Sequence, residues 1–515
     1  MNQVENFDRL VCTDAIRRDL RFRSVRAAGF TWAAGIADFV LRIGSTAILA
    51  RLLLPQQFGL VMMVTAVTAV ADQFRDLGLS TVTVQRKEIT HQQVTNLFWI
   101  NVFAGIAIAL MIGAVSPLVS VYYKEPRLTL ITCILATNFV WGGLVVQHEA
   151  LLARTLKLGH IAVVRVLSSM ISVIVAMLLA WKGFGYWALV WKEVVRWALL
   201  TLGMWICLPW IPGLPRRNAN VRALVRFGAH LSGANILVTM TAGADRFLLG
   251  KFWGASAVAF YRQAYQLLVL PMDQLLGPLF QVTQPGLSML QAEDAKYRHF
   301  YQKVLTIVCI ATMPVSLFVA VSATEITRVL LGRKWLECAG VLMILSLGTF
   351  IKEPVRWSAH ILITRGKSAR YLKLTLFQNV IVVLFMLIGV RWGITGVAAA
   401  DVVATYLLAA PTLYLSLKGS PVTMKTFVAT VARPAIASIA MAVSVRLLHQ
   451  SIMSSIGAPA FLLLASAVGL GSFIGIWMLL PGGKAELADL VADARAAVRR
   501  RVEIAKPVEP IAVAG

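Results

Sequence analysis

Residues 244–291 read ADRFLLGKFWGASAVAFYRQAYQLLVLPMDQLLGPLFQVTQPGLSMLQ, an apolar stretch that carries charges at intervals. The stretch predicts two membrane helices joined by a tight turn. The first helix ends near residues 252–253, the turn is the Gly-Ala-Ser sequence at 254–256, and the second helix begins at Ala257. A proline removes a backbone donor and clashes with the preceding turn, so we expect the second helix to be kinked and to line a cavity. Its prolines are Pro271, Pro278 and Pro285.

The composition of the whole chain is that of a membrane protein. Of its 515 residues, 58% are hydrophobic and 14% are charged, whereas soluble globular proteins are about half apolar and about a quarter charged. In a soluble chain the formal net charge of +25 would suggest a nucleic-acid partner. Here the basic residues lie in short segments between apolar runs, as the positive-inside rule predicts. We therefore expect anionic membrane lipids as a partner, and no nucleic acid.

Fourteen apolar segments have the length of about 20 residues that spans a bilayer as a helix. The chain is therefore expected to be an all-α polytopic membrane protein with about 14 transmembrane helices. The segments are Ala27–Leu54, Phe58–Val84, Val94–Val121, Leu128–Leu151, Ile161–Trp181, Tyr186–Trp210, Gly228–Trp253, Ala257–Val282, Val304–Val321, Ala339–Ile361, Leu372–Val390, Ile394–Leu417, Phe427–Leu448 and Ala458–Leu480.

The basic residues of the connecting loops predict an orientation. With the N-terminus inside, the inner loops hold roughly twice as many lysines and arginines as the outer loops, which is the sense of the positive-inside rule. An even number of spans then places both termini in the cytoplasm.

A faint internal repeat divides the spans into two halves. A shift of 200 residues places Ile48–Val64 on Leu248–Ala264, with Arg51 on Lys251. Internal repeats are a common basis of alternating access, although two apolar helices with a short turn can also look alike by chance. The predicted organisation is a basic cytoplasmic segment (1–26), a first lobe of helices 1–6 (27–211), a basic cytoplasmic connection (212–227), a second lobe of helices 7–12 (228–418), helices 13–14 (419–481) and a cytoplasmic tail (482–515).

The central stretch also resembles a known family. The pattern ADRFLLGKFWGASAVAFYRQAY, then LP, GPL, PGLSMLQ and a charged Tyr-Arg segment, resembles bacterial polysaccharide flippases of the Wzx type, which serve O-antigen and exopolysaccharide synthesis. They belong to the multidrug/oligosaccharidyl-lipid/polysaccharide exporter superfamily. The resemblance is close from about Arg226 to Lys334. It implies two pseudo-symmetric six-helix lobes with two added helices in the bacterial inner membrane. It also implies a substrate, a polyprenyl-diphosphate-linked oligosaccharide repeat unit that moves from the inner to the outer leaflet, and other membrane proteins of polysaccharide synthesis as partners.

Many charged residues lie inside the predicted spans. An ion at the bilayer centre costs several kcal/mol, so these side chains should face protein or water. We expect a hydrated cationic cavity between the lobes, because arginine matches phosphate oxygens with a planar fork of donors. The alternative is that they form intrahelical pairs, since Asp38–Arg42, Asp72–Arg75 and Glu193–Arg196 have the required spacing. The candidate headgroup contacts are Arg42, Arg75, Lys192, Arg196, Arg246, Arg262, Lys352 and Arg356.

Three acidic residues are candidates for ion coupling. Asp273 and Asp401 have no basic neighbour three or four residues away, so either could carry a proton or bind sodium. Asp72 joins them because it falls one position from Asp273 in the repeat. A salt bridge to a basic residue on another helix is the alternative for each.

No catalytic constellation is evident, so we expect a transporter and not an enzyme. The five cysteines are far apart, which fits neither a disulfide framework nor a metal site, and no cofactor is expected. The alternatives within the same superfamily are a lipid II flippase and a cation-coupled drug exporter. A membrane-embedded polysaccharide polymerase is the alternative from another class, and the short loops argue against it.

Overall fold

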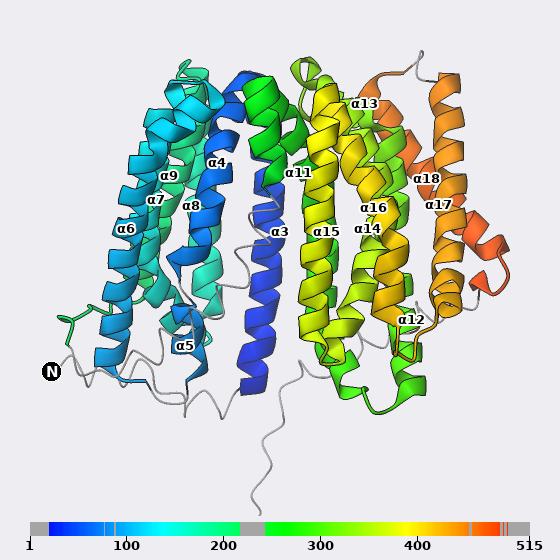
Figure 1. The fold of residues 1–515 in the computed structure, drawn as a ribbon, viewed down its shortest axis with the longest axis horizontal. Helices are drawn as coiled ribbons and strands as arrows, with labels where there is room; N and C mark the ends of the chain where they lie inside the picture. Colours follow the sequence, from blue (N-terminus) through cyan, green and yellow to red (C-terminus); the bar gives the residue numbers. More distant parts are fainter. Residues whose placement is uncertain are drawn as a thin grey trace, which may run out of the picture.

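A computed structural model describes residues 20–76, 78–86, 89–216, 243–452 and 456–484, together with residues 488 and 492. Most of the predicted N-terminal segment, most of the basic connection, the start of the seventh predicted helix and nearly all of the tail therefore lie outside the described residues. What is described is helical and is arranged in two groups of roughly parallel helices (Figure 1).

In the described part of the chain, the first bundle comprises seven helices. α3 and α4 meet at Pro55, whose fixed backbone angle suits the first turn of a helix. The bundle is held by the packing of α6 on α7, α8 on α9 and α3 on α8. Its members are α3 (Leu20–Leu52), α4 (Pro55–Arg75), α5 (Leu79–Gln85), α6 (His91–Tyr123), α7 (Arg127–Arg154), α8 (Leu158–Trp181) and α9 (Tyr186–Cys207).

The second bundle is built around α11 and α14. α14 packs against α12, α16 and α11, while the last two helices pack on its outside through α12. The second bundle contains α11 (Ala244–Met289), α12 (Asp294–Val321), α13 (Ala323–Leu330), η1 (Arg333–Trp335), α14 (Glu337–Thr364), α15 (Ser368–Gly389), η2 (Val390–Trp392) and α16 (Gly393–Leu417), followed by α17 (Met424–Ile452) and α18 (Ala458–Leu479).

These helices confirm the predicted all-α membrane fold. Ten helical stretches of the described chain are long and apolar enough to cross a membrane, and one of them, Ser368–Leu417, contains both α15 and α16. α9 and α11 occupy the described parts of the remaining predicted spans, since residues 228–242 lie outside the described residues. The second predicted span is not one continuous helix. α4 ends at Arg75, and Gly78 adopts a φ of 68° before α5 begins. The short α13 was not predicted. α3 also begins earlier than expected, since residues 20–26 contain neither glycine nor proline.

The turn predicted in the central stretch is present, but it is one residue long. Gly254 has φ 80° and ψ −174°, and the backbone angles on both sides of it are helical. A side chain is rarely accommodated at such a positive φ, which is why the break falls on the glycine. The second helix therefore resumes at Ala255, not at Ala257. The prolines leave the backbone angles helical through to Met289, so the sharp break of α11 is at Gly254 and not at a proline.

Among the described residues, the hydrophobic core is shared between the bundles at one end only. The outer end is the end that carries Arg51 and Lys251, and the sequence predicts that it faces outward. A single cluster of buried residues there includes Leu60 of α4, Val258 of α11 and Leu342 of α14. Towards the inner end, the first bundle has its own core around Phe98, and the second has a separate one around Tyr301 and neighbouring residues. The bundles are thus fastened at the outer end and packed independently at the inner end.

Polar contacts reinforce the junction at the outer end. The indole Nε1 of Trp335 donates to the carbonyl oxygen of Ala50 at 2.9 Å, and the ring of Trp335 lies edge-on to Phe58 and Phe260. Arg51 Nη2 donates to the carbonyl of Val329 at 2.6 Å. Each of these hydrogen bonds joins the first bundle to the second.

The two repeat-related turns meet at this junction. A Cβ atom built on Gly59 would lie 1.8 Å from the carbonyl oxygen of Ala255, so α4 and α11 cross backbone to backbone. The repeat-related cations also make reciprocal contacts, since Arg51 reaches Val329 in the second bundle and Lys251 lies over the ring of Tyr122 in the first. The two partners, Val329 and Tyr122, are not themselves related by the shift of 200 residues, so the repeat stays a prediction.

Candidate functional site

The candidate site is a cavity of about 660 Å³ in the first bundle. Its walls come from α3, α4, α7, α8 and α9, and Gln266 and Leu270 of α11 close it on the side of the second bundle. We expected a cavity between the two lobes. The cavity instead belongs mainly to the first bundle, because the charged faces of α3, α8 and α9 converge there.

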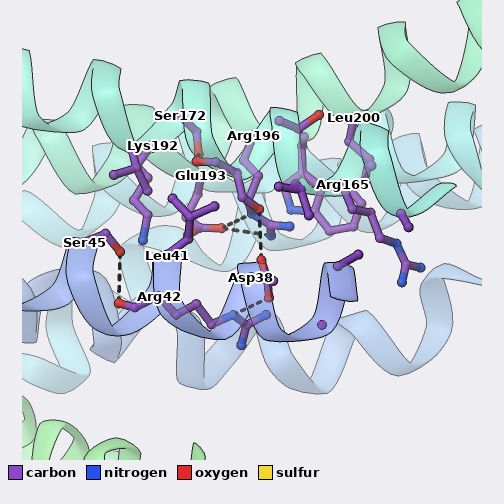
Figure 2. Close-up of a pocket in the computed structure, with 18 of the residues that line it drawn as sticks. Asp38, Leu41, Arg42, Ser45, Arg165, Ser172, Lys192, Glu193, Arg196 and Leu200 are labelled. Atoms are coloured by element: carbon purple, nitrogen blue, oxygen red, sulfur yellow. Dashed lines mark hydrogen bonds and ion pairs between the residues drawn. The ribbon is translucent and has the colours of Figure 1, made fainter. Parts of the chain in front are cut away.

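The lining is rich in charge. In Figure 2, Lys192, Glu193 and Arg196 extend from α9 towards α3, which carries Asp38 and Arg42. The lining holds five cations and three carboxylates, a formal net charge of +2. The cations are Arg42, Arg75, Arg165, Lys192 and Arg196, and the carboxylates are Asp38, Glu149 and Glu193.

The intrahelical pairs foreseen from spacing are present. Arg42 Nε lies 3.0 Å from an Asp38 oxygen, and Ser169 Oγ of α8 donates to the other oxygen of Asp38 at 3.3 Å. Arg196 donates to Glu193 from Nε and Nη2 at 3.2 and 3.0 Å. The pairs therefore coexist with a cavity, because each side chain also lines it.

Arg75 reaches the cavity from α4. Its Nη1 lies 3.3 Å from an Asp72 oxygen. Its aliphatic stem crosses α7 at Gly142, where a Cβ would approach the arginine Cδ to 2.4 Å. Its guanidinium carbon lies 4.3 Å from the centroid of the Trp197 ring, and that of Arg196 lies 5.0 Å from the same centroid.

Two charged residues of the cavity are not among the candidates predicted from the sequence. Arg165 of α8 pairs with Glu149 of α7, and both line the cavity. Each lies inside a predicted span. The other candidates were chosen because they are charged residues inside predicted spans, and the same criterion would have found these two. Lys192 has no ion pair within the described ranges, and its charge is the one least neutralised by a neighbouring carboxylate.

The four candidate cations of the second bundle lie elsewhere. Asp245 is buried and lies 3.9 Å from Arg246 and 3.6 Å from Arg262, whose guanidinium covers the ring of Tyr265. This cluster lies on α11, and none of it lines the cavity. The structure therefore does not bring all eight predicted cations together.

The remaining candidates are also paired. Lys352 Nζ lies 3.5 Å from Asp401, and Arg356 Nη2 lies 2.6 Å from Glu353. The alternative of a salt bridge to another helix thus applies to Asp401, because Lys352 lies on α14 and Asp401 on α16. Asp273 is exposed and has no ion pair in the part of the chain that is described.

This geometry suits an anion that is large and polar. Guanidinium groups present several N–H donors in a plane, which matches phosphate oxygens, and an ammonium adds a mobile point charge. The serines of α8 add neutral donors and acceptors, since Ser168, Ser169 and Ser172 line the same wall.

Comparison with known proteins shows which family the chain resembles. A family model described as a polysaccharide biosynthesis protein matches residues 48–340. The match begins in α3 and ends in α14, so it reaches well beyond the region of residues 226–334 where we expected the resemblance to be close.

Curated proteins and solved structures are also similar to the chain, among them the following three. The lipopolysaccharide biosynthesis protein WzxC of Escherichia coli (strain K12) is 25% identical over 381 residues, which is 72% of this chain and 76% of that protein. The succinoglycan biosynthesis transport protein ExoT of Rhizobium meliloti (strain 1021) is 24% identical over 333 residues, or 64% and 67%. The lipid II flippase MurJ, in an inward closed conformation, matches with a TM-score of 0.68 and 12% identity, over 88% of this chain and 97% of that one. The last likeness concerns the fold alone.

Proposed function

Because the chain belongs to the polysaccharide biosynthesis protein family, we propose that it flips polyprenyl-diphosphate-linked oligosaccharide repeat units across the bacterial inner membrane. It is an integral membrane transporter and not an enzyme, which excludes the polymerase alternative. The names of the two curated relatives connect them with lipopolysaccharide and succinoglycan synthesis. The polymer made with the help of this chain is accordingly a lipopolysaccharide or an exopolysaccharide.

The observation that carries the proposal is the cluster of five cations in the cavity of the first bundle. A diphosphate bearing a sugar chain is anionic and polar at one end, and it needs charge-assisted donors in place of water. The cavity supplies arginine forks from α3, α4, α8 and α9. An exporter of organic cations would need the opposite charge, so the drug-exporter alternative is disfavoured.

The division of the hydrophobic core supports alternating access. The bundles share one core at the outer end and have separate cores towards the inner end, so the inner ends can move apart without exposing a common core. In this proposal the cavity loads from the cytoplasm, with both termini on that side. Separation of α4 and α11 at their crossing then opens the outer end while the lipid tail stays in the bilayer.

The coupling ion is proposed to act through an acidic residue. Asp273 is exposed and has no ion pair within the described ranges, although Arg356 attracts it from a greater distance, so it is the candidate that can take up a proton or sodium without first breaking a salt bridge. Asp72 and Asp401 are held by Arg75 and Lys352 and would have to exchange those partners.

A deletion strain tests the proposal. The gene is deleted in its host, and both the secreted polymer and the lipid-linked repeat units on the cytoplasmic face are measured. We expect the polymer to be lost and the lipid-linked units to accumulate inside. The wild-type gene should restore export, and Arg75→Ala together with Arg196→Ala should not. Lys182→Ala is the matched control, because Lys182 is an exposed cation at the outer end of α8.

Other results would point to the alternatives. Unchanged polymer with accumulated lipid II would favour the lipid II flippase. Unchanged polymer with increased sensitivity to cationic drugs would favour the drug exporter. Full export by the double arginine variant would refute the cationic cavity as the headgroup site.

A further inference from the structure

Two of the cavity arginines share one aromatic ring. Arg75 comes from α4 and Arg196 from α9, yet both guanidinium carbons lie over the indole of Trp197, at 4.3 and 5.0 Å from its centroid. The ring brings two positive groups from different helices into one place. The two positive groups repel each other, so this arrangement is unfavourable unless another interaction stabilises it.

The ring itself can hold them. The face of an indole is negative, and a guanidinium within about 6 Å of the centroid is attracted to it. The side chains of Arg75 and Arg196 are 26% and 33% exposed, against 61% for Arg42 and 59% for Arg165. The two arginines over Trp197 are therefore the ones whose positions are most restricted.

The surrounding helices leave the pair little freedom. The stem of Arg75 lies in the notch at Gly142, where any Cβ would collide with it. The backbone at Trp197 also takes part in the packing, since its carbonyl accepts a hydrogen bond from Thr201 Oγ1 at 2.9 Å. The hydroxyl of Thr201 also contacts the carbonyl of Trp141 on α7 at 3.1 Å, which ties α9 to α7 beside the ring.

Each guanidinium keeps donors for a ligand. Within the described chain, Arg75 donates to Asp72 from Nη1 alone, and Arg196 donates to Glu193 from Nε and Nη2. A guanidinium has five N–H donors, so several remain on both side chains. Both guanidinium carbons lie within 5.0 Å of one centroid, so they are less than 10 Å apart. Any separation well below this limit lets two phosphoryl groups joined by one bridging oxygen engage both forks.

We propose that Trp197 is a positioning residue, which holds Arg75 and Arg196 as a pair so that the cavity selects a diphosphate over a monophosphate. This inference rests on the proposed function and adds to it the residue that sets the phosphate count. Asp72 and Glu193 serve as the counter-ions when no substrate is bound. Trp197 does not itself bind the phosphates.

Binding of sugar-free lipids tests this role. The purified full-length chain in lipid nanodiscs is titrated with farnesyl diphosphate and, separately, with farnesyl monophosphate. We expect the wild type to prefer the diphosphate by about tenfold, the size of one charge-assisted contact. In Trp197→Leu this preference should fall to near one, with monophosphate binding nearly unchanged. Trp197→Phe retains an aromatic face and should keep most of the preference.

Two further variants separate positioning from folding. Gly142→Ala displaces the stem of Arg75 without removing any charge, so it should also lower the preference. Trp181→Leu is the control, since Trp181 is 78% exposed at the outer end of α8 and should leave the preference unchanged.

The outcomes distinguish the two proposals. A wild type that binds neither lipid, or both equally, would refute the diphosphate site of the proposed function and this inference with it. A wild type that prefers the diphosphate, with Trp197→Leu and Gly142→Ala preferring it equally, would refute the positioning role and leave the proposed function standing.

Discussion

Replacing Gly59 by alanine should open the outer end of the protein. A Cβ at this position would lie 1.8 Å from the carbonyl oxygen of Ala255, whereas real Cβ contacts are essentially never closer than 3.0 Å. Because the neighbouring atom is backbone, no rotamer change can relieve the clash. α4 and α11 must therefore separate by more than 1 Å where they cross, or the protein must leave this conformation.

The free-energy cost of this clash gives the expected change in the ratio of outer-open to outer-closed molecules. Overpacking of this kind costs about 1–3 kcal/mol, and each 1.4 kcal/mol changes an equilibrium about tenfold. The ratio of outer-open to outer-closed molecules should then rise by about 5-fold to 160-fold. The inner cores do not include Gly59, so the bundles themselves should stay folded.

Distances between spin labels measure this shift. Labels are placed at Lys182→Cys and Arg391→Cys, which are exposed at the outer ends of the first and second bundles, in a background without the native cysteines. Pulsed electron resonance should show a longer distance gaining population in Gly59→Ala. Export of polymer should fall as the outer-closed state is depleted.

Gly113→Ala is the matched control for this experiment. Gly113 also lies inside a helix, but a Cβ there would meet nothing within 4 Å. Both variants gain the same helix propensity, so a difference between them reports the crossing alone. A wild-type distance distribution in Gly59→Ala would show that the contact with Ala255 does not stabilise the outer-closed state.

Three further predictions concern single side chains. Arg196→Lys should lower export about tenfold or more although the charge is kept, because lysine lacks the planar fork; export equal to wild type in the polymer assay would contradict this. Tyr301→Phe removes the 2.7 Å hydrogen bond to Ser358 in the second bundle and should lower the free energy of unfolding by about 0.6–1 kcal/mol; a double-mutant cycle with Ser358→Ala that shows no coupling would refute the bond. Glu125 lies in the loop between α6 and α7, and its pKa is lowered because Arg127 donates two hydrogen bonds to it. Its contribution to stability is therefore present at pH 7 and lost as the pH falls through the lowered pKa. Glu125→Gln should accordingly reduce the Tm at pH 7, the reduction should shrink as the pH is lowered through the acid range, and an equal reduction at every pH would overturn the assignment.

The sequence by itself determined the membrane fold and most of its helices. Spans are set by the length and apolarity of local segments, and these can be read without knowing any partner. The intrahelical pairs were predictable for the same reason, because residues three or four apart on a helix must be neighbours. The break at Gly254 followed from local chemistry, although its length of one residue did not.

The tertiary structure alone decided which charges share a cavity. Depth in the membrane selects a charged residue, but the face of the helix that it occupies depends on the packing of several helices. Arg75 and Arg196 therefore meet over Trp197, while Arg246 and Arg262 gather around Asp245 outside the cavity. The crossing at Gly59 likewise joins segments about 200 residues apart, and no local pattern contains that contact.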